Sequence, residues 1–201
     1  MSINHSLHLI YLNNDYPMVE TMKVIFHWFY CLPISRAIVL IILATLLYLW
    51  FRKRLRKMKF GNASAAVLLG CWLLVIIFAT LNQRAASIEP LEPILTPFYS
   101  YYVVFTGGER ELLWENFMNA ILFYPAGLLA CELLPKSWSR AKRVILVAVL
   151  FALVSAGIEF CQYHFALGQA EVDDVIHNAL GALIGALIST IPVKWKPGKL
   201  K

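Results

Sequence analysis

Long runs of apolar residues, almost free of charge, constrain this chain more than any other feature. Residues 63–81 carry no charged side chain, and residues 144–163 carry only Glu159. A helix needs about 20 mainly apolar residues to cross the hydrocarbon core of a bilayer. Apolar residues make up 60% of the sequence and charged residues 15%, against roughly 45–50% and about 25% in soluble domains. This composition excludes soluble, disordered and coiled-coil classes and indicates an integral membrane protein.

The apolar runs predict an all-α fold, a polytopic transmembrane helical bundle of about five spans. The first run has a charge-free part that is shorter than a full span. We therefore expect Arg36 to reach the interface or Pro33 to interrupt a longer helix. The five expected spans are residues 37–51, 63–81, 117–134, 144–163 and 175–193.

The basic residues indicate how the spans are oriented. Fourteen of the eighteen Lys and Arg residues fall in three short tracts, each next to the end of an apolar run. The positive-inside rule places such tracts in the cytoplasm, so we expect an external N-terminus, an internal C-terminus and no nucleic-acid partner. Anionic lipid headgroups are also attracted to such tracts. The tracts are Arg52, Lys53, Arg54, Arg56, Lys57 and Lys59; Lys136, Arg140, Lys142 and Arg143; and Lys194, Lys196, Lys199 and Lys201.

The same pattern divides the chain into three parts. Residues 1–36 are expected to form an extracytoplasmic or interfacial segment, residues 37–193 the bundle, and residues 194–201 a basic cytoplasmic tail. The longest connection, residues 82–116, contains prolines, glycines and several aromatic side chains. Aromatic residues favour the headgroup layer, so we expect this outer loop to fold back against the external surface.

Polar side chains inside the last three spans mark a candidate site, because such residues are costly in a membrane. Asp174 and Asn178 lie on one helical stripe with Gly181 and Gly185. The other two spans also have a face that is small toward the cytoplasm and polar toward the outside. We expect these faces to pack together and enclose a polar pocket in the outer leaflet. The predicted ligand-binding residues are Asn119, Glu159, Gln162, Asp174 and Asn178.

Small residues and a proline are expected to shape the packing. Gly181, Gly185 and Gly127 allow helix backbones to approach closely, and Pro125 should kink its helix and free a backbone carbonyl. Three alternatives concern the polar residues. Asn119 and Asn178 could act only as interhelical hydrogen-bond partners, and Asp173 could be the N-cap of the last helix. A metal site is disfavoured because the sequence has no HExxH motif, and no cofactor motif is present.

From the aromatic loop onward, over residues 70–190, the chain resembles a VanZ-like membrane protein. The resemblance implies a multi-pass protein of the bacterial cytoplasmic membrane, with a role in resistance to the glycopeptide antibiotic teicoplanin. Family members often have an Arg shortly before the Asp of the last motif. Gln169 stands there in this chain, which disfavours an anionic ligand at that end. The matching elements are Pro97-Phe98-x-Ser100-Tyr101, Asn119-x-x-Leu122-Phe123-x-Pro125-x-Gly127, Glu159-x-x-Gln162 and Asp174-x-x-x-Asn178-x-x-Gly181-x-x-x-Gly185.

Three functions fit these residues. In the first, the pocket binds an amphiphilic ligand, either a lipid-tailed glycopeptide or a lipid-linked cell-envelope precursor, and so confers resistance. In the second, the protein is a membrane enzyme with Glu159 and Asp174 as general acid and base. In the third, it is a structural or assembly protein whose polar residues only fix the helix register. The oligomeric state does not follow from the sequence.

Overall fold

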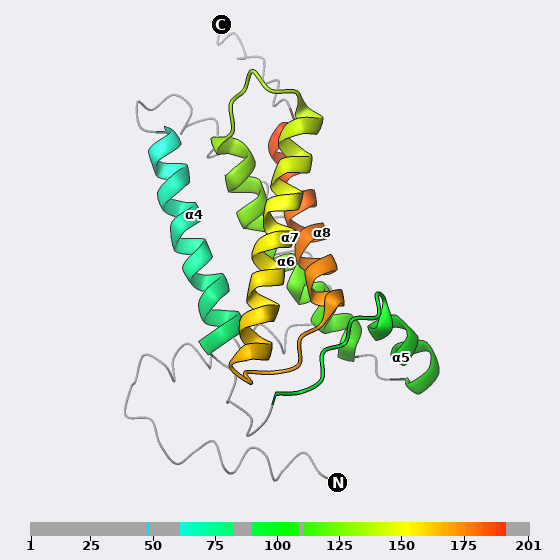
Figure 1. Cartoon of the computed structure of the whole chain (residues 1–201). Helices are drawn as coiled ribbons and strands as arrows, with labels where there is room; N and C mark the ends of the chain where they lie inside the picture. Colours follow the sequence, from blue (N-terminus) through cyan, green and yellow to red (C-terminus); the bar gives the residue numbers. More distant parts are fainter. Residues whose placement is uncertain (1–47, 49–60, 83–89, 109–110, 192–201) are drawn as a thin grey trace, which may run out of the picture. The chain divides into compact units, whose positions relative to one another are not determined.

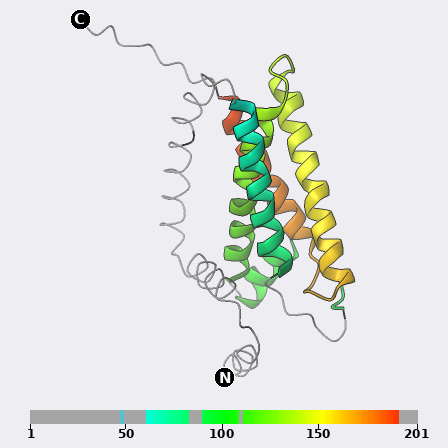
Figure 2. The same ribbon diagram turned by 90° about the vertical axis from the view of Figure 1, so that its left-hand side faces the viewer.

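The computed structural model describes Tyr48 and residues 61–82, 90–108 and 111–191. In these ranges the fold is helical, with one isolated β-bridge between Ile94 and Glu171. The all-α prediction is therefore confirmed for the described residues. The four long helices run along a shared direction, and α5 lies at one end of them (Figures 1 and 2). The elements are α4 (Gly61–Ile77), a π-helical turn η2 (Phe78–Asn82), α5 (Tyr99–Gly107), α6 (Glu111–Leu133), α7 (Arg140–His164) and α8 (Val172–Thr190).

Three of the helical stretches are long and apolar enough to cross a membrane. They are Asn62–Leu81, Arg140–His164 and Val172–Thr190, which overlap three of the predicted spans. The expected span at 117–134 lies largely within α6. The expected N-terminal segment 1–36, the rest of the span at 37–51 apart from Tyr48, and the basic tail 194–201 are outside the described residues.

The predicted outer loop, residues 82–116, contains more helix than expected. Residues 99–107 form α5, and α6 already begins at Glu111 instead of Phe117. The acidic residues Glu111 and Glu115 end the apolar pattern, but they do not end the helix. Negative side chains are favourable in the first turn of a helix, where they face the positive end of its dipole.

The outward faces of α4 and α7 are apolar. Leu74 on α4 is 66% exposed, and Leu153 and Phe160 on α7 are 67% and 65% exposed. A soluble monomer seldom presents such continuous apolar surfaces to water. These faces therefore fit contact with lipid, in agreement with the length of the helices.

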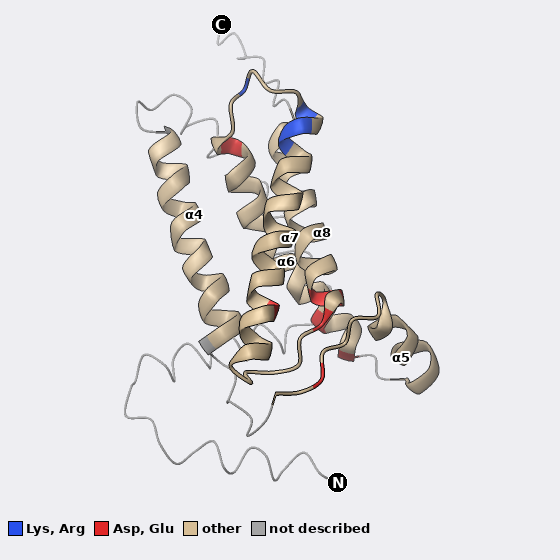
Figure 3. Cartoon of the chain, viewed as in Figure 1, with Lys and Arg blue, Asp and Glu red and all other residues tan. Residues whose placement is uncertain are grey.

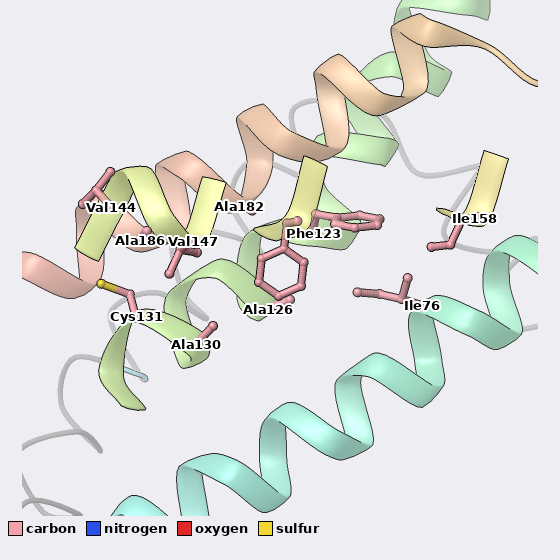
Figure 4. Packing of buried hydrophobic residues seen from close by; sticks show 11 residues of the cluster. Ile76, Phe123, Ala126, Ala130, Cys131, Val144, Val147, Ile158, Ala182 and Ala186 are labelled. Atoms are coloured by element: carbon pink, nitrogen blue, oxygen red, sulfur yellow. The ribbon is translucent and has the colours of Figure 1, made fainter. Parts of the chain in front are cut away.

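The core of the bundle lies between α6 and its neighbours (Figure 4). Phe123 of α6 is fully buried and packs edge-on against Phe151 of α7, with ring centroids 6.0 Å apart. Ile76 of α4 and the small residues Ala182 and Ala186 of α8 complete this region. Large rings on α6 and α7 thus fill the space that small side chains on α8 leave.

Helices α6 and α8 approach closely at three glycines. A Cβ atom on Gly181 would overlap the backbone of Ala120, and one on Gly185 would overlap the carbonyl oxygen of Tyr124. In the opposite direction, a Cβ atom on Gly127 would overlap the backbone of Ala182. Only glycine has no Cβ atom, so these positions let the two backbones come into direct contact.

The indole of Trp72 joins α4 to α6 beside the proline. Its Nε1–H donates to the carbonyl oxygen of Leu122 over 2.8 Å, three residues before Pro125. Helix α6 continues through Pro125. The expected freed carbonyl is that of Ile121, because proline has no N–H for the residue four positions earlier. The carbonyl that accepts from Trp72 is instead that of Leu122, one residue after Ile121.

We expect Trp72→Phe to destabilise the protein by about 1 kcal/mol, because it removes one interhelical hydrogen bond but keeps an aromatic ring. For a chain of this size the melting temperature in detergent should fall by roughly 2–4 °C. Trp138→Phe is the control, since Trp138 packs at the far end against Lys142. Equal melting temperatures for the wild type and Trp72→Phe would contradict the assigned bond.

Candidate functional site

The basic side chains of the described bundle gather at one end, together with Glu132, and the other acidic side chains lie toward the opposite end (Figure 3). The end of the bundle where α6 and α8 begin and α7 ends is called the polar end. All five predicted ligand-binding residues lie on the helix turns near this end: Asn119, Glu159, Gln162, Asp174 and Asn178. They make contacts between helices, but they do not all contact one another.

Two asparagines link α8 to its neighbours. Asn119 of α6 donates from Nδ2 to Oδ1 of Asp174 over 2.7 Å, and both side chains are half-buried. Asn178 of α8 donates from Nδ2 to Oγ of Ser155 on α7 over 2.8 Å, and both are buried. The first pair lies nearer the surface of the bundle and the second lies inside it. Only the first pair is therefore accessible to a ligand without rearrangement.

Glu159 and Gln162, at the end of α7, bond to backbone groups. The Glu159 carboxylate is 7% exposed and accepts a hydrogen bond from the backbone N–H of Glu171 over 3.0 Å. Gln162 is 1% exposed and donates from Nε2 to the carbonyl oxygen of Thr80 over 3.0 Å. That carbonyl lies in the π-helical turn after α4. These two residues therefore fix the start of α8 and the end of α4.

Two buried amide oxygens have no donor within the described residues, Oε1 of Gln162 and Oδ1 of Asn178. A buried acceptor without a partner is costly, and native proteins usually satisfy such atoms with protein groups or ordered water. Both atoms belong to side chains that the sequence predicted as ligand-binding. Both oxygens lie inside the bundle, so a donor for them has to come from ordered water or from a group that enters between the helices.

The most connected acid of the polar end is Asp173, for which the sequence favoured the N-cap position of α8. That prediction is wrong, because Glu171 occupies the N-cap position of α8. Asp173 is 2% exposed, and its carboxylate accepts hydrogen bonds from the backbone N–H of Phe98, the N–H of Ser100 and the hydroxyl of Ser100. These donors belong to the first turn of α5. Asp173 thus caps α5 from another helix.

Further polar residues complete this cap. Asn116 of α6 donates from Nδ2 to Oγ of Ser100 over 2.8 Å, so the Ser100 hydroxyl accepts one hydrogen bond and donates another. Phe98 has the left-handed backbone angle φ 61°, which is strained for a large side chain. The bond from its N–H to Asp173 helps to hold this conformation.

His177 of α8 makes a second connection to α5, at Tyr101, the residue after Ser100. Its Nδ1 lies 2.6 Å from the carbonyl oxygen of Asp173, and its Nε2 lies 2.8 Å from the hydroxyl of Tyr101. A carbonyl can only accept, so Nδ1 carries the proton. In the neutral ring, Nε2 then accepts from Tyr101. The two rings stack with centroids 5.7 Å apart.

The chain before α5 runs beside the loop between α7 and α8. Ile94 pairs with this loop through its N–H to Ala170 (2.8 Å) and its carbonyl to Val172 (3.0 Å). Gln169, in the same loop, donates from Nε2 to the carbonyl oxygen of Glu92 over 2.8 Å. Gln169 therefore takes part in joining two loops.

Within residues 61–82, 90–108 and 111–191, no three His, Cys, Asp or Glu side chains come close enough together to hold a metal ion. The described carboxylates of Asp173, Asp174 and Glu159 instead accept hydrogen bonds from protein donors.

Comparison with known proteins identifies the family. The family model for VanZ/LLP1 matches residues 65–192, from α4 to the end of α8. No curated protein and no solved structure matches the chain. The match covers more than half of the sequence and includes the complete polar end. With its long apolar helices, the chain is a membrane protein that belongs to the VanZ/LLP1 family.

Proposed function

We propose that this protein acts in the bacterial cytoplasmic membrane by binding an amphiphilic ligand at its polar end, which faces outward. A lipid-tailed glycopeptide of the teicoplanin type is the favoured ligand, and binding lowers susceptibility to it. The observation that carries the proposal is the half-buried hydrogen bond between Asn119 and Asp174. The residue before Asp174, Asp173, caps α5, a helix with exposed aromatic side chains.

Helix α5 offers a surface suited to an amphiphile. Phe105 is 84% exposed, Tyr102 is 64% exposed and Phe98, just before the helix, is 57% exposed. Tyrosine and phenylalanine at a membrane surface have apolar rings for acyl chains, and tyrosine adds a hydroxyl for sugars or headgroups. Asp173 fixes the first turn of α5 to α8. The aromatic surface and the Asn119–Asp174 pair therefore share one rigid support.

The proposal is tested by measuring susceptibility in strains that express or lack the protein. Expression should raise the inhibitory concentration of a lipid-tailed glycopeptide and leave that of a glycopeptide without an acyl tail unchanged. Asn119→Leu should abolish the effect, because it removes the amide that bonds Asp174. Equal effects on both drugs, or no effect on either, would count against this ligand.

A surface variant separates ligand binding from folding. Phe105→Ser should weaken the protective effect, since it removes the most exposed ring of α5. Phe160→Ser is its control, because Phe160 is also exposed but lies on α7. Membrane levels of both variants are compared by immunoblot. The same loss of protection in both would show that the aromatic surface of α5 has no special role.

The structural alternative is favoured by a specific observation, namely that the polar side chains mostly bond to one another and to the backbone. Glu159→Gln distinguishes the three functions. A structural role predicts less folded protein, because the neutral amide of glutamine accepts the hydrogen bond from the Glu171 N–H more weakly than the carboxylate does. An enzyme acting on lipid-linked substrates predicts normal folded yield with loss of turnover. A ligand-binding protein predicts normal yield with altered susceptibility only.

A further inference from the structure

The opposite end of the bundle contains an arginine that is buried without a partner among the described residues. We call this end of the bundle the basic end. Its basic residues are Lys136, Arg140, Lys142 and Arg143. Arg143 is 8% exposed, whereas the other three are exposed. Its Nε atom is buried and has no hydrogen-bond partner, and its side chain makes no ion pair with the described residues. This end is separate from the site proposed above.

A buried arginine Nε–H without an acceptor is unusual, because polar groups inside proteins are normally hydrogen-bonded. The acid at this end of the bundle, Glu132 of α6, has other partners. Its carboxylate accepts from Oγ of Ser189 over 3.2 Å and lies 3.4 Å from Nζ of Lys136. Arg143 is on the same buried stripe of α7 as Val147 and therefore faces the other helices.

The surroundings of Arg143 favour an anion. It lies in the first turns of α7, whose N-terminus carries a partial positive charge. Ser139 caps that terminus by accepting from the N–H of Lys142, and Nζ of Lys142 lies 4.1 Å from the centre of the Trp138 ring. A guanidinium can bind two oxygens of one phosphate through parallel N–H groups.

We propose that Arg143 binds a phosphate oxyanion at the basic end, and that the source is the headgroup of an anionic phospholipid. The apolar residues that follow on α7 support a lipid source. Leu146 and Leu150, three and seven residues after Arg143 and so close to its side of the helix, are 42% and 48% exposed, so an acyl chain attached to the phosphate can lie along the helix. A free phosphate ion shares the same chemistry but has no use for this surface.

The test uses the full chain in an uncharged detergent and follows its melting temperature during titration. The three probes are dioleoylphosphatidylglycerol, dioleoylphosphatidylcholine and inorganic phosphate. We expect saturable stabilisation by the anionic lipid, little by the zwitterionic lipid and none by phosphate. Stabilisation by inorganic phosphate as well would assign the oxyanion site to free phosphate. No response to either anion would overturn the proposal.

Arg143→Met tests the residue. It should weaken apparent binding of the anionic lipid at least about tenfold, the usual effect of losing a charge-assisted hydrogen bond. Without lipid the variant should melt at the same temperature as the wild type or higher, because a buried N–H group without an acceptor has been removed. A role of Arg143 in folding alone predicts the opposite, a lower melting temperature.

Arg140→Met is the matched control, since Arg140 is an exposed arginine on the same helix. Its lipid affinity should stay within about twofold of the wild type, as expected for an exposed charge contact. Equal losses in Arg140→Met and Arg143→Met would overturn the assignment to Arg143. If Arg143→Met does not fold, Arg143→Lys replaces it. Lysine keeps the charge without the two parallel N–H groups, so affinity should again fall below that of Arg140→Met.

Discussion

Replacing Asp173 with alanine is expected to release α5 from the bundle and to destabilise the protein by roughly 3 kcal/mol. The buried carboxylate accepts two backbone N–H groups and one hydroxyl, all from the beginning of α5. Each hydrogen bond to a charged group contributes about 1.5–3 kcal/mol, and its loss leaves a buried donor without a partner. Hydrogen exchange of the amides of residues 98–107 should become much faster, and the melting temperature should fall.

Asp174→Ala is the matched control for this prediction. Asp174 is the next residue, but it is half-buried and accepts from Asn119 of α6. We expect it to weaken the contact between α6 and α8 while α5 keeps its slow exchange. If α5 amides exchange at wild-type rates in Asp173→Ala, the carboxylate does not hold this helix.

The difference between these two neighbouring acids shows how far the sequence could predict the site. Consecutive residues of a helix point about 100° apart. Asp174 shares a face with Asn178, and the polar stripe made that face visible. Asp173 shares a face with His177, which meets Tyr101 of α5. Because α5 was not predicted as a helix, nothing in the sequence supplied a partner for this second face.

The long helices were predictable, since each apolar run is about as long as a helix needs to be to cross a bilayer. Helix α5 was not, because it is short, lies between proline and glycine residues, and has a first turn that depends on a carboxylate 73 residues later in the sequence. One sign of it was present in the sequence. Ser100 and Tyr101 belong to a motif of the family resemblance, and both residues contact α8 through their side chains.

The contacts of Glu159 and Gln162 also depended on the structure. The sequence marked both as polar residues inside a span, and the two are buried. Their partners, however, are backbone groups of Glu171 and Thr80. Every residue has such groups, so no residue pattern can reveal which of them will be used. The same reasoning applies to Trp72 and the carbonyl of Leu122.

Gly181→Leu is expected to have the largest effect of any single substitution at the helix interfaces. A side chain at this position meets the backbone of Ala120. Backbone atoms cannot rotate away, so α6 and α8 must separate, and the pairing of Asn119 with Asp174 would be lost with them. Overpacking typically costs about 1–3 kcal/mol, and we expect this site to be at or above the upper limit because backbone atoms must move. We therefore expect little folded protein on size-exclusion chromatography in detergent.

Gly157→Leu is the control, because Gly157 lies in α7 and a Cβ atom added to it would have no neighbouring atom within 4 Å. Leucine is a better helix former than glycine by roughly 0.5–1 kcal/mol, so this variant should fold at least as well as the wild type. The clash at Gly181 is with backbone, so Ala120→Gly should not rescue Gly181→Leu. Rescue by Ala120→Gly would mean that side chains separate α6 from α8. Normal folding of Gly181→Leu alone would contradict the close approach of the two helices on which the polar end depends.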